Sequence, residues 1–155
     1  MPQQNIKMER LNLPTFELKL KSEGEKKCVF DEIRKKWLVL TPEEWVRQNF
    51  LHYLIHFKKF PSSLLAVEYA LSINKQAIRS DIVAFSNEGS PFLIVECKAP
   101  DVKITQATFD QIAVYNMVLN VEYLVLTNGM KHFCCKMDFE NKKYSFMSDI
   151  PEYPF

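Results

Sequence analysis

The sequence predicts an α/β fold in which a mixed central β-sheet is flanked by helices. Helical and strand-like segments alternate along the chain in the order helix, three strands, helix, strand. The segment Phe92–Lys98 is apolar without alternation through Val95, which is typical of a central strand covered on both faces. With 155 residues, of which 47% are hydrophobic, the chain can bury a core of its own. We therefore predict a single domain over residues 1–155.

The domain is expected to have a core of about residues 41–137, with residues 1–40 packed on it as N-terminal strands. Weak alternation in the N-terminal part indicates short strands at Phe16–Leu20 and Lys36–Leu40. A charged stretch, Lys21–Lys27, lies between these two strands and is interpreted as a turn region.

The first helix has a clear start signal at residues 41–44. Thr41 is the expected N-cap, Pro42 suits the first helical position, and Glu44 completes a capping box three residues after the cap. The helix is predicted to end near Phe57, before Pro61. The apolar side chains at helical spacing, which predict the buried face, are Val46, Phe50, Tyr53, Leu54 and Phe57.

Three strands are expected after this helix. In the first, period-two spacing places Val67, Tyr69, Leu71 and Ile73 on one face. The second is predicted over Ile78–Phe85, and the third is the apolar segment already described.

A second helix and the last strands complete the predicted sheet. We expect the helix at about Thr105–Leu119 and a buried strand over 121–127. Asn128-Gly129 then predicts a hairpin turn, followed by small strands over 131–137 and 144–147.

Three charged residues stand where the core pattern predicts none. Glu96 and Lys98 lie two apart at the end of the buried third strand, so both side chains project from one face. A turn near Glu88-Gly89 would place Asp81 opposite Glu96, because paired positions then sum to about 177. Two facing carboxylates are unfavourable unless a positive group lies beside them. Lys98 and a divalent metal are the two candidates.

The carboxylates suit a magnesium or manganese site. Asp and Glu oxygens are hard ligands, and Mg²⁺ usually binds through one or two carboxylates together with substrate phosphate. Under this hypothesis Asp81 and Glu96 bind the metal, and Lys98 orients the attacking water or stabilises charge on the phosphate. The alternative is a Glu96–Lys98 salt bridge at a strand end, with Asp81 as an ordinary surface acid.

Four segments together resemble the PD-(D/E)xK nuclease superfamily, specifically the N-terminal nuclease region of type I restriction enzyme R (HsdR) subunits. The similarity extends from about residue 29 to residue 137 and implies a restriction-endonuclease-like fold with an αβββαβ core. Ser80 stands where the superfamily's eponymous proline would be. The matching segments are Thr41–Gln48, Arg79–Val83, Leu93–Pro100 and Phe109–Asn116.

The resemblance also implies roles for residues outside the acidic pair. Gln111 and Tyr115 match a Q-x-x-x-Y element, in which the glutamine lies near the catalytic centre and positions the lysine or the DNA backbone. One helical turn separates them, so both can face one cleft. A surface glutamine beside a half-buried tyrosine is the structural alternative. Glu44 matches a first-helix glutamate that reaches the metal in similar nucleases, although the capping box explains it equally well.

Composition limits the other possible functions. The four cysteines form no C-x-x-C pair and are interpreted as reduced, mostly buried thiols. Three glycines cannot form a phosphate-binding loop, so no ATPase motor is expected. There is no apolar run of membrane-spanning length and no secretory-signal pattern at the start, which predicts a cytoplasmic protein without a membrane partner.

We therefore expect a Mg²⁺-dependent (or Mn²⁺-dependent) endonuclease that hydrolyses DNA phosphodiester bonds and has no helicase motor. DNA is the expected partner, together with separate restriction-modification subunits; the sequence leaves the oligomeric state open. An alternative is a non-catalytic nucleic-acid-binding or assembly module of a restriction or repair complex. A structure-specific repair nuclease could use the same residues. Salt-dependent binding to different DNA structures would separate these possibilities.

Overall fold

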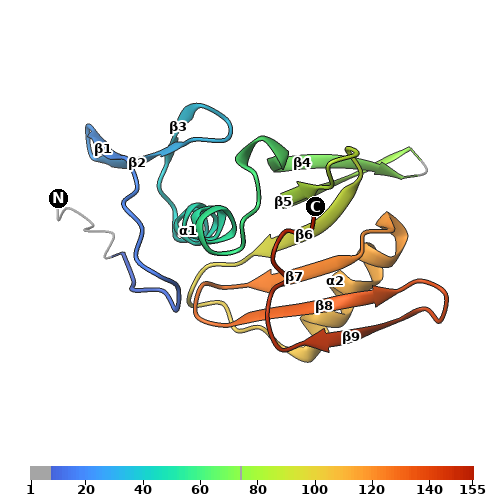
Figure 1. The fold of residues 1–155 in the computed structure, drawn as a ribbon. Helices are drawn as coiled ribbons and strands as arrows, with labels where there is room; N and C mark the ends of the chain where they lie inside the picture. The colour runs from blue at the N-terminus through green and yellow to red at the C-terminus, as the bar shows by residue number, and fades with distance from the viewer. Residues whose placement is uncertain (1–7, 74) are drawn as a thin grey trace.

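A six-stranded mixed sheet forms the centre of the molecule in the computed structural model, which describes residues 8–73 and 75–155 (Figure 1). The side chains at positions 73, 76, 115 and 118 lie outside this description. Strands β6 and β7 pair in parallel through a helical crossover, whereas the other neighbouring pairs are antiparallel. In spatial order the strands are β4 (Leu65–Ile73), β5 (Gln76–Phe85), β6 (Pro91–Cys97), β7 (Tyr123–Thr127), β8 (His132–Asp138) and β9 (Lys143–Met147).

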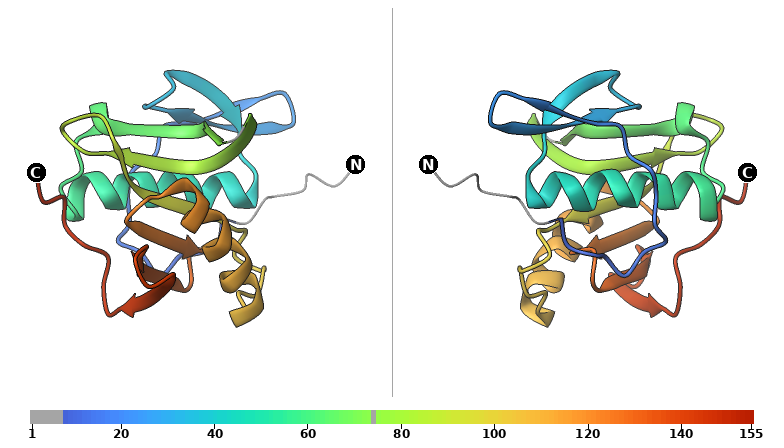
Figure 2. Two further views of the ribbon diagram at one scale, coloured as in Figure 1. Left: turned by 90° about the vertical axis from the view of Figure 1, so that its right-hand side faces the viewer. Right: turned by 90° about the vertical axis from the view of Figure 1, so that its left-hand side faces the viewer.

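Helices α1 (Pro42–Phe57) and α2 (Gln106–Leu119) cover opposite faces of this sheet (Figures 1 and 2). Alternate residues of β6 divide between the two cores: Val95 packs on the α1 side and Ile94 on the α2 side. The predicted αβββαβ order and the mixed sheet with flanking helices are therefore confirmed.

The cap of α1 forms as the sequence predicts. The Thr41 hydroxyl accepts a hydrogen bond from the Glu44 backbone N–H at 3.1 Å. Val46, Phe50 and Leu54 are fully buried, but Phe57 is 51% exposed. The prediction that Phe57 belongs to the buried face is wrong because the helix ends there and the chain turns at Lys58 and Lys59. A short 3₁₀ turn, η1 (Ser62–Leu64), then leads into β4.

A separate three-stranded antiparallel sheet precedes α1, formed by β1 (Leu20–Glu23), β2 (Lys26–Asp31) and β3 (Lys36–Val39). The charged stretch Lys21–Lys27 is therefore largely a hairpin, not the turn region between two strands that its charge indicated. Gly24, at φ +62°, forms the turn of this hairpin.

Strand β4 does not follow the predicted alternation. Val67 packs in the core on the α1 side, whereas Leu71 packs against the core on the α2 side. Glu68 lies between them with φ +50°, a left-handed conformation that interrupts the pleat. The prediction that these apolar residues share one face is wrong for this reason; the side chain of Ile73 lies outside the described part.

The remaining sequence-based expectations concern cysteines and membrane segments. All four cysteines are free and buried, as predicted. Among the described residues, no helix is long and apolar enough to cross a membrane.

Candidate active site

Asp81 on β5 lies directly opposite Glu96 on β6. The register pairs Ile82 with Val95 and Val83 with Ile94, which aligns the two acids at the next position. Burial raises the pKa of Glu96 well above its ordinary value, and the charge of Asp81 together with a hydrogen bond between the two carboxyl groups raises it further. The second oxygen of Asp81 accepts the backbone N–H of Cys97 at 2.8 Å. Two close carboxyl groups therefore share one site.

Lys98 follows β6 immediately and is half-buried. Its backbone N–H donates to the Thr127 carbonyl of β7 at 2.8 Å, which fixes the chain at the end of the strand. The positive charge of Lys98 partly offsets the rise in the pKa of Glu96. The lysine therefore lies within electrostatic range of the acidic pair.

Glu43 is the glutamate of α1 that faces this pair. Partial burial raises its pKa, the charge of Asp81 raises it further, and Lys98 acts in the opposite direction. The charge of Glu43 in turn raises the pKa of Glu96. No sequence pattern distinguishes Glu43, because its neighbour Glu44 matches both the capping box and the family pattern.

Glu44 is buried and occupied by contacts within the protein. One carboxylate oxygen accepts hydrogen bonds from Arg34 Nη2 at 3.0 Å and from Gln48 Nε2 at 3.1 Å. The other oxygen lies 3.1 Å from Arg47 Nη2. Because both oxygens already have cationic or amide partners, this geometry favours a structural role for Glu44 over metal binding.

Arg47 and Glu68 connect this cluster to Asp81. Arg47 Nη1 lies 3.1 Å from Glu68 Oε1, and Arg47 Nη2 lies 3.9 Å from Asp81 Oδ1. In register, Glu68 lies opposite Asp81, since Val67 pairs with Ile82 and Tyr69 with Ser80. The ion pair with Arg47 lowers the pKa of Glu68. Glu68, Asp81 and Glu96 thus form a row across three adjacent strands.

The β2–β3 turn supplies the second arginine of this network. Arg34 Nη1 lies 3.1 Å from Glu68 Oε2, and Arg34 Nε lies 2.7 Å from Asp31 Oδ2. Asp31 is fully buried and also accepts from Gln48 Nε2 at 3.0 Å. We call Asp31, Arg34, Glu44, Arg47, Gln48 and Glu68 the arginine network. No periodic signal in the sequence indicated Arg34 or Glu68, because their contacts join separate elements.

Helix α2 holds the two remaining predicted site residues, Gln111 and Tyr115. Gln111 lies on the exposed surface of α2, and no hydrogen bond joins it to Asp81, Glu96 or Lys98 within the described part of the chain. Tyr115 belongs to α2, but its side chain lies outside the described residues. Ile112 and Asn116 instead line a pocket that also contains Glu96 and Lys98.

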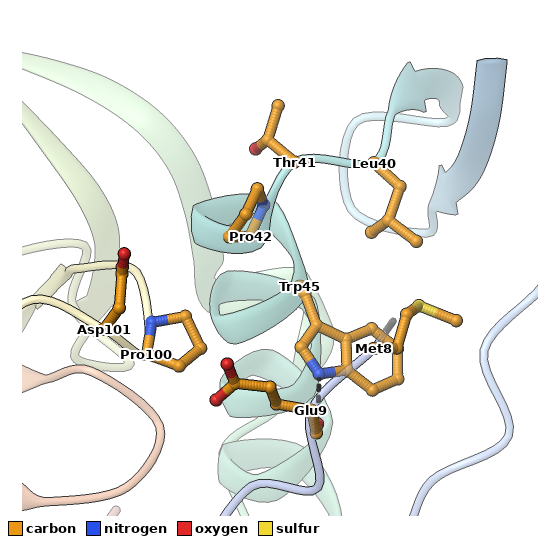
Figure 3. Close-up of a pocket in the computed structure, with 8 residues that line it drawn as sticks. All are labelled: Met8, Glu9, Leu40, Thr41, Pro42, Trp45, Pro100 and Asp101. Carbon is orange, nitrogen blue, oxygen red and sulfur yellow. Dashed lines mark hydrogen bonds between the residues drawn. The ribbon is translucent and has the colours of Figure 1, made fainter. Parts of the chain in front are cut away.

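A second pocket lies at the start of α1, between Trp45 and the loop after β6 (Figure 3). There the Trp45 indole N–H donates to the Glu9 carbonyl at 2.9 Å and holds the N-terminal segment on the helix. The lining of this pocket includes none of the predicted site residues. Glu96 and Lys98 line the pocket beside α2 instead.

The donor set suits a small hard cation. Among the described residues, no three His, Cys, Asp or Glu side chains form a ready metal-binding cluster. Mg²⁺ does not require one, since one or two carboxylates with water and phosphate suffice. Asp81 and Glu96 provide such a pair of carboxylates, and they offer no nitrogen or sulfur ligand of the kind that zinc sites use.

Comparison with known proteins identifies the family. The model of the type I restriction enzyme R protein N terminus (HSDR_N) matches residues 42–151. The chain belongs to this family. A search of curated proteins gives no significant match. Among solved structures, the chain is similar to a fragment described as an HsdR subunit of a type I restriction enzyme from Vibrio vulnificus YJ016, with 17% sequence identity and a TM-score of 0.51.

This chain spans about a quarter of the length of the Vibrio chain. The alignment covers 74% of this chain and 24% of the Vibrio chain. At this identity the neighbour supports the fold, which is the restriction-endonuclease-like arrangement expected from the sequence. The match also confirms the resemblance to the R-subunit N-terminal nuclease region.

Proposed function

We propose that this HsdR N-terminal-like chain is a metal-dependent deoxyribonuclease that hydrolyses DNA phosphodiester bonds endonucleolytically in the cytoplasm. The observation that carries the proposal is the pair of facing carboxyl groups, Asp81 and Glu96, with Lys98 at the end of the same strand. Family membership supports a nuclease domain of the R-subunit type. The three glycines of the sequence form no phosphate-binding loop, so ATP-driven movement along DNA is not part of the proposal.

Each residue has a distinct proposed role. Asp81 and Glu96 would hold Mg²⁺ or Mn²⁺, and Glu43 would contribute a third negative charge beside them. When bound, the cation supplies Lewis acidity at the scissile phosphate and favours ionisation of a water molecule. The Lys98 ammonium group orients that water by hydrogen bonding or stabilises the negative charge that develops on the phosphate. Gln111, from its exposed position on α2, would contact the DNA backbone.

The cationic arginines have a supporting role in this proposal. Arg47 lies 3.9 Å from Asp81 and ties it to Glu68, which limits the positions that the Asp81 carboxylate can adopt. The backbone N–H of Cys97 holds the other oxygen of Asp81. A carboxylate held from two sides presents a fixed ligand, as catalysis by positioned charges requires.

The first test combines metal binding with DNA cleavage. Calorimetry with Mg²⁺ and Mn²⁺ and cleavage of supercoiled and linear DNA would be measured for wild type, Asp81→Ala and Lys98→Ala. We expect Asp81→Ala to lose metal binding and cleavage, and Lys98→Ala to lose cleavage while binding the metal. Asp101→Ala and Lys103→Ala remove equal charges from exposed neighbouring positions and should retain both activities.

Two results would reject parts of the proposal. A wild-type protein that binds neither cation and cuts no DNA would exclude a stand-alone enzyme. Metal and DNA binding without cleavage would favour the alternative of a non-catalytic module that works with separate restriction-modification subunits, which is consistent with the small share of the Vibrio chain that this chain spans.

A further inference from the structure

The pocket beside the acidic pair has a volume of about 230 Å³ and lies between α2 and strands β5 and β6. Its walls are largely aliphatic, with Ile94 and Leu124 from the sheet and Ile112 from α2. Glu96 and Lys98 form its side toward the proposed catalytic site. The proposed hydrolysis involves Glu96 and Lys98 but none of the aliphatic residues of the pocket.

Two buried polar side chains in the pocket lining have oxygens without a hydrogen-bond partner among the described residues. They are Ser80 Oγ and Asn116 Oδ1, and each residue is 1% exposed. The amide of Asn116 is held by its other end, because Nδ2 donates to the Val121 carbonyl at 3.1 Å. A buried polar atom without a partner is costly, and such atoms in native structures call for an explanation. Both residues belong to the pocket lining, so a ligand seated there is a candidate partner.

The size and chemistry of the pocket fit a flat heteroaromatic ring. An apolar cavity of about 150 Å³ is large enough to bind benzene, and this pocket is larger. Ile78, Ile112 and Leu119 of the lining are partly exposed and provide apolar surfaces for the faces of a ring. Asn116 Oδ1 can accept from a ring N–H or amino group, and the Ser80 hydroxyl can donate to a carbonyl or ring nitrogen. Every nucleobase carries such donors and acceptors along its edge.

We propose that this pocket binds one unstacked nucleobase of the DNA strand, in the nucleotide next to the phosphate that is cut. The proposal rests on the proposed nuclease function, because Glu96 and Lys98 fix the position of that phosphate. Arg79, an exposed residue of the same lining, is placed to contact the flanking backbone. Unstacking costs least in single-stranded or frayed DNA, so these substrates are preferred over intact duplex.

The test uses DNA with one 2-aminopurine at successive positions around the mapped cleavage point. Its fluorescence is quenched by stacking and rises when the base leaves the stack. Measurements in Ca²⁺, on samples in which gel analysis shows intact DNA, would be paired with anisotropy to record binding itself. We expect a severalfold fluorescence rise at one position next to the cleavage point and little change elsewhere.

Matched variants separate a base pocket from a general effect on DNA binding. Ile112→Trp fills the pocket from α2 and should abolish the fluorescence rise. Val114→Trp adds the same bulk at a position that is 65% exposed and should preserve it. Ser80→Ala removes the unpartnered hydroxyl, so it should fold at least as stably as wild type while base affinity falls by up to about tenfold, the weight of one hydrogen bond.

Titration with deoxynucleoside monophosphates, followed by calorimetry, tests the pocket separately from cleavage. Saturable binding that Ile112→Trp removes and Val114→Trp retains would support the pocket even if the chain cuts no DNA. DNA binding by anisotropy with no fluorescence rise at any position, or mononucleotide binding unaffected by Ile112→Trp, would overturn the proposal while leaving the nuclease assignment in place.

Discussion

Two neighbouring glutamates at the start of α1 have different surroundings. Glu44 is buried, and its oxygens contact Arg34, Gln48 and Arg47. Glu43 has a half-exposed side chain, and the charges of Asp81 and Lys98 act on it. A single position along the helix therefore separates a residue that holds the fold together from one that faces the proposed metal site.

This difference predicts opposite effects for two conservative substitutions. Glu43→Gln should leave stability within about 0.5 kcal/mol of wild type, as for an ordinary surface change, and should reduce cleavage about 10–100-fold, as for a residue supporting a metal site. Glu44→Gln leaves two arginines without their charged partner and should cost about 3 kcal/mol. Urea unfolding and Mg²⁺-dependent cleavage rates would be measured for both.

Glu43→Gln and Glu44→Gln are the same chemical change at adjacent positions, so each variant serves as the control for the other. If Glu44→Gln abolished metal binding in a fully stable protein, Glu44 would be the first-helix ligand of the family pattern, and its structural role would be wrong.

At the scale of elements, strand β4 contains a local irregularity beside the site. Glu68 adopts φ +50° within the strand, and its carboxylate contacts Arg34 and Arg47. A left-handed conformation costs about 1–2 kcal/mol for a residue other than glycine. The contacts of the arginine network offset that cost, and they turn Glu68 toward the two arginines.

At position 68 we therefore expect the glycine variant to be more stable than the alanine variant, which is the reverse of the usual order in a strand. Glu68→Ala and Glu68→Gly both lose the ion pairs, but glycine also relieves the left-handed strain. Glu68→Gly should be the more stable by about 1 kcal/mol, although glycine in a regular strand is usually about 0.5–1 kcal/mol less stable than alanine. Chemical denaturation of the two variants measures the difference.

Ser72, exposed on the same strand without positive φ, provides the reference pair. There alanine should be at least as stable as glycine. Equal stabilities of Glu68→Ala and Glu68→Gly would mean that the left-handed conformation does not persist in solution.

The order of helices and strands from α1 onward was predictable because each has a local signal. The capping box starts α1, and the apolar run around Val95 marks a buried strand. The hairpin register placed Asp81 opposite Glu96 from the turn position alone. The arginine network was not predictable, because its members come from a turn, a helix and an irregular strand, and their pairing depends on tertiary packing. Glu43 carries no local signal of its own, because the capping box and the family pattern both point to Glu44.

Across the whole molecule, charge is nearly balanced but unevenly placed. The net charge is +1, with 12 Lys/Arg and 8 acids in residues 1–60 and 8 Lys/Arg and 11 acids in the remainder. Three of those later acids, Glu68, Asp81 and Glu96, gather in one row across the sheet. Arg34 and Arg47 balance Glu68, so without a cation it is chiefly the Asp81 carboxylate, beside Glu96, that opposes the approach of a DNA phosphate.

Divalent metal should therefore control DNA affinity as well as cleavage. We expect Ca²⁺ or Mg²⁺ to strengthen DNA binding at least about tenfold over EDTA at equal ionic strength, because phosphate contacts dominate affinity.

Asp81→Asn removes one negative charge and a metal ligand together. It should bind DNA more tightly than wild type in EDTA and gain little from metal. Asp101→Asn makes the same charge change at an exposed position and should keep the full metal response. Anisotropy titrations of the three proteins, with and without Ca²⁺, measure these responses. A full metal response in Asp81→Asn would place the cation elsewhere and separate DNA binding from the acidic pair.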